Sequence, residues 1–132
     1  GTIKAGSESD HVSAFWDFVP TALEMAGSNN NVKTDGISYL PTFLGQAQEK
    51  HKYLYWEFYE GNGKQAVLWG DWKAVRVGMH KKKDPKFQLF NLKTDPSEKN
   101  NVAAKHPTVI EKIRQFAKEA HSESPIFKFR GK

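Results

Sequence analysis

Two carboxylates three residues apart, Glu57 and Glu60, are the first candidates in this sequence for general acid–base chemistry. Such chemistry needs a proton donor and a proton acceptor within reach of the same reacting group. Both residues fall in or beside a predicted strand, where side chains three positions apart point to opposite faces. The spacing therefore favours two exposed carboxylates near a turn over a catalytic pair.

The sequence offers no complete nucleophilic or metal-binding motif. It contains no cysteine, which excludes thiolate chemistry, cysteine-ligated metals and disulfides. No serine stands in a Gly-x-Ser-x-Gly sequence, and the five histidines show no His-x-x-x-His spacing. Gly61-Asn62-Gly63 fits a hairpin turn better than a phosphate-binding loop. We therefore expect this chain to catalyse nothing alone and to hold no metal.

Aromatic and basic side chains suggest two other classes of function. Three tryptophans, Trp56, Trp69 and Trp72, could stack on a sugar, as in a stand-alone carbohydrate-binding module, but at strand positions they more often form the core. The net charge of +5 is concentrated at 81–83 and 128–132, which would permit binding to nucleic acid. A solvated turn and a frayed terminus explain the same charges more simply.

The elements that must position these residues form one α+β domain. Strand alternation places Leu54, Trp56 and Phe58 on one face of a strand and the tyrosines around Glu57 on the other. Apolar spacing indicates a helix at each end of the chain. The predicted elements are a helix from about 17 to Gly27 with Pro20 in its first turn, a short helical turn at 43–45, strands at 52–59, 65–69, 72–77 and 86–92, and a helix that begins at Pro107.

These elements predict a four-stranded antiparallel sheet, connected as a meander, with the C-terminal helix packed across one face. An N-terminal helix and loop segment precedes the sheet. We expect residues 1–50 to be a connecting arm, helix and loop, and residues 51–132 to be the sheet and its helix, together in one compact unit. Asp95-Pro96-Ser97-Glu98 resembles a helix-capping signal. The segment 126–129 is compatible with a short edge strand or with loose packing.

Several motifs in order resemble the late part of type I (formylglycine-dependent) sulfatases, the family that includes the arylsulfatases. Each motif is weak alone, but the order and the gaps are those of the family, over essentially the whole chain. The motifs are Gly1-x-Ile3-x-Ala5-Gly6, Phe18-Val19-Pro20-Thr21 running to Ala26-Gly27, Asp35-Gly36-Ile37-Ser38 with Leu40-Pro41 and Leu44-Gly45, Tyr55-Trp56-Glu57-Phe58, Gln65-Ala66-Val67, Gly70-Asp71-Trp72-Lys73, Leu89-Phe90-Asn91-Leu92, and Asp95-Pro96-x-Glu98-x-Asn100.

The resemblance implies a sulfuric ester hydrolase whose chemistry belongs to a domain that precedes this one. Sulfatases use a formylglycine and a calcium ion, and the residues that hold them lie in the N-terminal domain, so no position here is carried over as nucleophile, metal ligand or sulfate clamp. The chain resembles the C-terminal subdomain, which packs on that N-terminal domain and helps to wall the substrate cleft. The hairpin 56–65 then becomes the candidate for substrate contact. The residues it suggests for hydrogen bonds to substrate hydroxyls are His51, Glu57, Tyr59 and Gln65. Lys73 could attract an anionic sugar, but an exposed position in the strand ladder explains it more simply.

The same resemblance sets the expected partners. They are the N-terminal sulfatase domain of the parent chain and a sulfated carbohydrate, with neither nucleic acid nor membrane. We expect an exposed apolar patch within 10–45 to mark the interface with the missing domain. Through that interface the isolated chain is expected to self-associate. Family analogy places the parent in the periplasm, the lysosome or the extracellular space.

Overall fold

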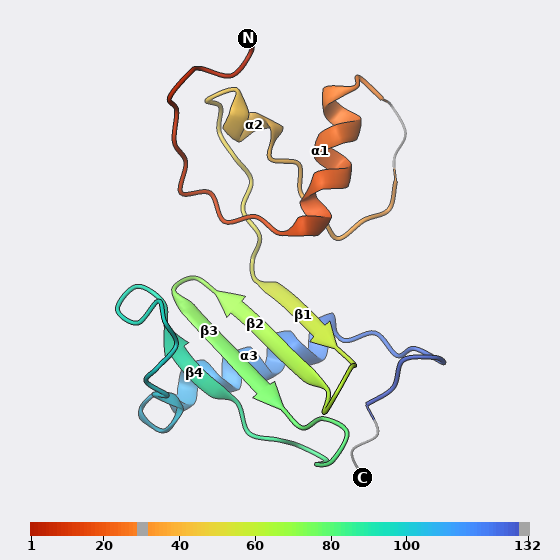
Figure 1. Cartoon of the computed structure of the whole chain (residues 1–132), viewed down its shortest axis with the longest axis vertical. Helices are drawn as coiled ribbons and strands as arrows, with labels where there is room; N and C mark the ends of the chain where they lie inside the picture. The colour runs from red at the N-terminus through yellow and green to blue at the C-terminus, as the bar shows by residue number, and fades with distance from the viewer. Residues whose placement is uncertain (29–31, 130–132) are drawn as a thin grey trace. The chain divides into compact units, whose positions relative to one another are not determined.

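The computed structural model describes residues 1–28 and 32–129, and it divides into two compact units (Figure 1). The first unit comprises residues 1–52 and the second begins at Tyr53. The first is helical and the second is a sheet with a helix, so the α+β prediction is confirmed. The expectation that both segments form one compact unit stays a prediction. Within the described residues, no helix is both long and apolar enough to cross a bilayer.

The first unit is built on a short helix and the loop that follows it. The chain forms a 3-10 turn, η1 (Phe15–Asp17), then α1 (Phe18–Met25), and later α2 (Leu40–Phe43). Pro20 falls in the first turn of α1, where its missing N–H costs nothing. Gly27 ends the helix in the left-handed region with φ 64°, and the Ser28 N–H bonds back to the Leu23 carbonyl.

Asp17 joins three separate segments of the first unit. Its buried carboxylate accepts hydrogen bonds from the Ala14 N–H at 2.7 Å and the Ile37 N–H at 2.9 Å. His51 Nε2 lies 2.8 Å from the same carboxylate. Burial alone would raise the pKa of Asp17, but these partners outweigh it and hold the pKa below its usual value. One carboxylate thus fixes the chain before the helix, the loop after it and the end of the unit.

Two further contacts hold the loop against α1. Thr21 is buried, donates to the Asp17 carbonyl and accepts the Tyr39 N–H at 3.0 Å. Gly36 approaches the start of the helix so closely that an added Cβ would lie 2.4 Å from the Trp16 carbonyl oxygen. Only glycine fits there, because the neighbouring atom is backbone and cannot rotate away.

The second unit contains the predicted meander. Strands β1 (Leu54–Phe58), β2 (Lys64–Trp69), β3 (Trp72–Val77) and β4 (Gln88–Asn91) form one antiparallel sheet in the order β1-β2-β3-β4. Left-handed glycines, Gly61 and Gly63 in the first hairpin and Gly70 in the second, make the tight turns possible. The register pairs Glu57 with Gln65, and Gln65 with Arg76. This register aligns three polar residues in one row across the sheet.

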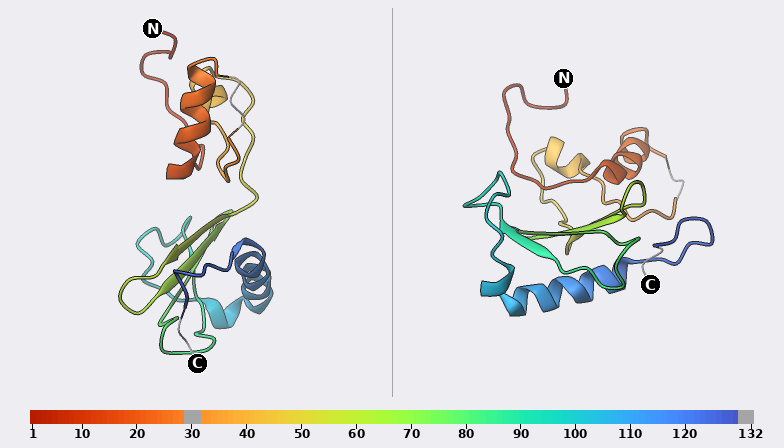
Figure 2. Two further views of the ribbon diagram at one scale, coloured as in Figure 1. Left: turned by 90° about the vertical axis from the view of Figure 1, so that its right-hand side faces the viewer. Right: turned by 60° about the horizontal axis from the view of Figure 1, so that its bottom comes forward.

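Helix α3 (Pro107–Ala120) covers one face of the sheet, as Figure 2 shows. After a 3-10 turn, η2 (Ala103–Lys105), the helix begins at Pro107 as predicted. Phe116 lies at the centre of the interface, stacked on Tyr53 at 4.4 Å and edge-on to Trp69 at 5.6 Å between ring centroids. The fully buried residues of this core come from β2, β3, β4 and α3, and they include Val67, Ala74, Leu89, Ile113 and Phe116.

The opposite face of the sheet carries large apolar side chains that remain exposed. Trp56 is 37% exposed, and Phe58 and Val77 are each 50% exposed. The register places Trp56 and Phe58 of β1 and Val77 of β3, with β2 between them, on the side that α3 does not cover. Such an apolar face on a small domain is typical of a surface that another protein element covers.

The segment 95–98 does not form the predicted helix start. Asp95 does cap a turn, since its carboxylate accepts the Lys99 and Asn100 N–H groups. Glu98, however, has φ 54°, which a continuing helix cannot accommodate, and its carboxylate pairs with the Lys73 ammonium. The capping box is therefore wrong in its second half, because an ion pair to the sheet competes for Glu98.

The C-terminal tail takes the looser of its two expected arrangements. Residues 126–129 form no strand. Instead, Phe129 stacks on Tyr59 with ring centroids 4.4 Å apart, and Phe127 lies 5.6 Å from the same ring. The tail thus contacts the end of the first hairpin through aromatic side chains.

Candidate functional site

The candidate site is built around the carboxylate of Glu57, which lies on the face of β1 that α3 covers. Four side chains contact this carboxylate. The hydroxyls of Tyr55 and Tyr59 donate to it, as does Gln65 Nε2 at 2.7 Å. His121 Nδ1, just beyond the end of α3, lies 2.6 Å away. The site therefore joins two strands and the helix at one end of the sheet.

The hydrogen bonds decide the charge state of this site. Burial alone would raise the pKa of the Glu57 carboxyl, but its four partners favour the ionised form and hold the pKa below its usual value. The tyrosines shift in the opposite direction. Burial and the adjacent carboxylate raise the pKa of Tyr59 to about 12, and the same two causes raise that of Tyr55. At neutral pH the site holds one carboxylate and two neutral phenols.

The polar row continues from Glu57 across the sheet. Gln65, itself buried, accepts a hydrogen bond from Arg76 Nε at 2.7 Å. Arg76 also pairs with Asp84 at 2.8 Å, and Arg114 of α3 pairs with the same carboxylate at 2.9 Å. The Arg76 guanidinium lies over the Phe87 ring at 4.6 Å from its centroid. These contacts fix the orientation of each side chain in the row.

This geometry supports positioning rather than proton transfer. A carboxylate with a lowered pKa that already accepts several hydrogen bonds is a poor general base near neutral pH. Among the residues that the structure describes, no three His, Asp or Glu side chains group as ligands for a metal ion. The row can orient hydrogen-bond donors and cations toward an anionic or hydroxylated ligand.

The structure brings together three of the four residues suggested from the sequence. Glu57, Tyr59 and Gln65 are in one hydrogen-bonded group. His51 belongs to the first unit, where its Nε2 contacts the buried Asp17. Lys73 is half-buried and ion-paired with Glu98 rather than free in an exposed ladder position.

Sequence reasoning missed His121, Tyr55 and Arg76 as members of the site. His121 stands 64 residues after Glu57, and no local pattern links the two positions. A usable signal did exist, because His121 follows Ala117 by four residues and so continues the buried stripe of α3. A polar residue that extends a buried stripe indicates a buried polar partner on the element beneath it.

Comparison with known families decides among the functions suggested by the sequence. The model of the family described as N-sulphoglucosamine sulphohydrolase, C-terminal, matches residues 1–123. The chain belongs to this family. The sulfatase resemblance is thereby confirmed, and nothing in the comparisons favours a stand-alone carbohydrate-binding module over it.

Individual relatives of this sulfatase C-terminal chain are themselves sulfatases. It is 31% identical over 123 residues to arylsulfatase K of Homo sapiens, an alignment that covers 86% of this chain. It is 31% identical over 92 residues to an N-acetylgalactosamine-6-O-sulfatase of Bacteroides thetaiotaomicron, which covers 62% of this chain. These alignments span only 23% and 18% of the length of those two relatives.

Solved structures show the same fold. A protein in complex with its substrate D-glucosamine-2-N,6-O-disulfate matches with a TM-score of 0.74 and 25% identity. The match covers 89% of this chain and 26% of that protein. This sulfatase C-terminal chain therefore corresponds to about a quarter of a complete enzyme of that kind.

Proposed function

We propose that this chain is the C-terminal lobe of a sulfuric ester hydrolase, where it stabilises the catalytic domain and walls the substrate cleft, and that it is inactive alone. The observation that carries the proposal is the family match along residues 1–123. The resemblance implies that calcium and formylglycine are held by residues of the N-terminal domain, and among the described residues of this chain no three His, Asp or Glu side chains group as metal ligands. The proposal assigns that chemistry to the catalytic domain.

Exposed apolar surfaces on each unit support a partner domain. On the second unit they are Trp56, Phe58 and Val77 of the uncovered sheet face. On the first unit, within the segment 10–45, Phe15 is 92% exposed and Phe18 is 57% exposed. Full burial of one such side chain stabilises an interface by roughly 1.5–3 kcal/mol. Burial of several such side chains would stabilise the contact with a catalytic domain.

The same surfaces support self-association of the chain in isolation. Without its catalytic domain, the chain exposes apolar side chains to water on both units. Light scattering on the purified chain should therefore show dimers or larger species whose fraction rises with concentration. A monomer at all concentrations would contradict this part of the proposal.

The substrate wall is the finer part of the proposal. We assign Glu57, Tyr59 and Gln65 to it, with His51 at the entry to the first strand. Support comes from the hydrogen-bonded group on one hairpin, in which Glu57 and Tyr59 are half-buried and the buried Gln65 holds the Glu57 carboxylate in place. Tyr59→Phe in the complete enzyme should raise KM severalfold and leave kcat within about twofold. The lost hydrogen bond would stabilise the bound substrate and the transition state equally, so its removal weakens binding without slowing the chemical step. An unchanged KM would remove Tyr59 from the wall.

The main test compares the chain alone with the longer protein that carries it. The longer protein should hydrolyse a fluorogenic aryl sulfate, and the chain alone should show no turnover above the blank. Phe58→Glu should lower the melting temperature and the activity of the longer protein, because it places a charge in the proposed interface. Ile126→Glu is the matched control, since Ile126 is 81% exposed on the tail. Robust turnover by the chain alone would refute the proposal.

Export of the parent protein is a further part of this proposal, supported by its membership of the sulfatase family. Fractionation of cells that express the complete protein should place it in the periplasm, the lysosome or the medium. Recovery in the cytosol would contradict export and leave the support role untouched.

A further inference from the structure

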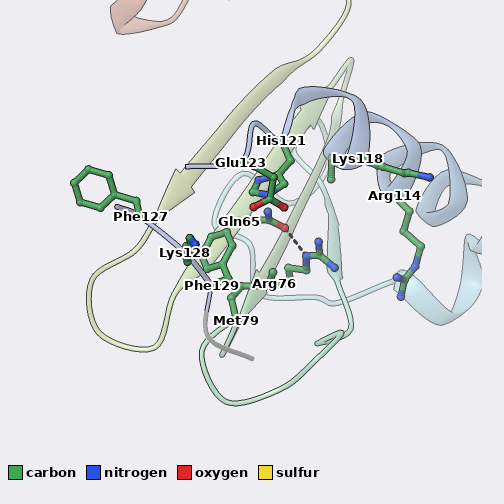
Figure 3. Close-up of a pocket in the computed structure, with 11 residues that line it drawn as sticks. Gln65, Arg76, Met79, Arg114, Lys118, His121, Glu123, Phe127, Lys128 and Phe129 are labelled. Atoms are coloured by element: carbon green, nitrogen blue, oxygen red, sulfur yellow. Dashed lines mark hydrogen bonds and ion pairs between the residues drawn. The ribbon is translucent and has the colours of Figure 1, made fainter. Parts of the chain in front are cut away.

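A pocket of about 460 Å³ opens on the side of the sheet that α3 covers, next to the polar row (Figure 3). Its volume lies in the range of sites for small molecules. Strands β2 and β3, helix α3 and the C-terminal tail all contribute to its walls. Phe127, Lys128 and Phe129 lie beyond residue 123, where the family match ends. This part of the wall lies outside the residues that the family model matches.

The charges around the pocket are mostly positive. Arg76, Arg114, Lys118 and Lys128 all line it, against one carboxylate, Glu123, whose side chain is 88% exposed. Arg114 and Lys118 stand four residues apart and so share one face of α3. Among the described residues, Lys118 and Lys128 take part in no ion pair. A cavity with this excess of cations attracts anions.

Arg76 is held in a fixed orientation at the pocket wall. Its Nε donates to Gln65, as the dashed line in Figure 3 shows, and Gln65 is in turn bonded to Glu57 and Tyr55. The ring of Phe87 supports the guanidinium from one side. A guanidinium that is already ordered loses little entropy when it binds an oxyanion, and its planar fork suits two oxygens at once.

Asp84 shows where an oxyanion fits. Its carboxylate accepts bonds from both Arg76 and Arg114, although its side chain is 57% exposed. An exposed loop carboxylate that bridges two guanidiniums occupies a place that a ligand oxyanion could take. Asp84 itself lines a different hollow and reaches this pocket only through the two arginines. The pocket's own walls include Met79 and Phe129, whose apolar side chains offer a surface for a ring face.

We infer that this pocket binds an oxyanion carried by a sugar ring, a sulfate ester or a carboxylate. Arg114, Lys118 and Lys128 contact the anion, the ordered Arg76 supplies the fixed charge, and Asp84 is the internal competitor. The inference rests on the proposed function only for the choice of sugar ligands. The site itself follows from residues of this chain, so it can be tested without the catalytic domain.

The test is a titration of the ¹⁵N-labelled full chain, at low salt, with four probes. They are N-acetylglucosamine 6-sulfate, glucuronate, uncharged N-acetylglucosamine and inorganic sulfate. The first or the second should shift the amides of Arg76 and residues 114–118, and which of them binds identifies the anion. Uncharged sugar should shift none. Inorganic sulfate that binds as tightly as the sulfated sugar would overturn the sugar part of the inference, and no shift with any probe would overturn all of it.

Variants with matched controls separate a site from general charge attraction. Lys118→Gln should weaken binding about tenfold, the loss expected for one hydrogen bond to a charged group. Lys105→Gln makes the same charge change at an exposed position outside the pocket and should leave the affinity within twofold. Equal effects of the two variants would reduce the pocket to a diffuse positive surface and so overturn the inference.

Asp84, which competes with the ligand for Arg76 and Arg114, provides a test in which binding should become tighter rather than weaker. Asp84→Asn should tighten binding severalfold, because it frees both guanidiniums. Glu111→Gln, at an exposed position of α3, makes the same charge change and should have little effect. Weaker binding by Asp84→Asn, in a chain with an otherwise unchanged amide spectrum, would overturn the assignment. If the parent protein is an active sulfatase but the pocket binds none of the four probes, this inference alone is refuted. If the pocket binds a probe but the parent protein is inactive, only the proposed function is refuted.

Discussion

Replacement of Glu57 by glutamine is the sharpest test of the site, because it removes one charge without removing the side chain. The carboxylate accepts bonds from Tyr55, Tyr59 and Gln65 and contacts His121. Glutamine keeps one acceptor oxygen, but its amide nitrogen can only donate. At least one donor therefore loses its acceptor, and His121 loses its anionic partner.

The hydrogen bonds that Glu57→Gln removes set the size of the expected loss of stability. A hydrogen bond to a charged group contributes roughly 1.5–3 kcal/mol, and the partial exposure of His121, 28%, argues for the lower half of that range. We expect the second unit to lose about 2 kcal/mol. For a domain of 60–100 residues, that loss corresponds to a decrease in melting temperature of roughly 8–16 °C.

The pH dependence has a defined sign. The pKa of Glu57 is lowered in the folded state relative to its usual value of 4.5. Its contribution to the free energy of unfolding is therefore complete above about pH 4.5 and is lost as the pH falls through the folded pKa. The difference between the wild type and Glu57→Gln should be largest near neutral pH and should shrink in acid.

Native-state amide hydrogen exchange of β1 and β2 is the assay, because it reports the stability of this unit without interference from the first. Glu60→Gln is the matched control on the same hairpin, at an exposed position. If Glu57→Gln changes stability by no more than about 0.5 kcal/mol, as surface substitutions do, the reasoning about the network is refuted.

Two other substitutions test the carboxylate of the first unit and the phenol of the second. Asp17→Asn should cost about 1–3 kcal/mol and speed exchange of the Ile37 amide, because asparagine cannot accept all the bonds that Asp17 accepts, whereas Asp10→Asn should change neither. Equal exchange in both variants would contradict the role of Asp17. The pKa of Tyr59 is raised from 10.0 to about 12 in the folded chain, so the wild type should lose stability as the pH rises from 10.0 toward 12, because the unfolded chain releases this proton first. Tyr59→Phe should reduce that loss, because phenylalanine has no proton to release in the unfolded chain. An identical alkaline dependence of the two proteins, followed by circular dichroism, would contradict the raised pKa of Tyr59.

The fold was predictable where local chemistry decides it. Alternation around Trp56 and the glycine turns fix the strands and their order, since hairpins join neighbours in sequence. Pro107 marks the start of α3 because proline suits a first helical position. Glu98 shows the limit of such signals. Its local pattern favours a capping box, but an ion pair to Lys73, 25 residues earlier, competes for the carboxylate.

The site was predictable only in part for the same reason. Glu57, Tyr59 and Gln65 share a hairpin, so alternation and register bring them together. His121 joins them only after the whole sheet has formed and the helix has crossed it. The link between His51 and Asp17 spans 34 residues and depends on the loop at Gly36. Contacts of this kind come from packing, and no short pattern encodes them.

The close approach at Gly36 also limits how this lobe can be re-engineered. A methyl group there would meet the Trp16 carbonyl, and the loop would have to lift away from α1. The adjacent Ile37 amide would then leave Asp17, and His51 would lose the rigidity of its only described anchor. Loop grafts and library mutagenesis of the first unit should therefore spare position 36. Even a methyl group there would disturb the contact of His51 with Asp17, close to the start of the second unit in the chain.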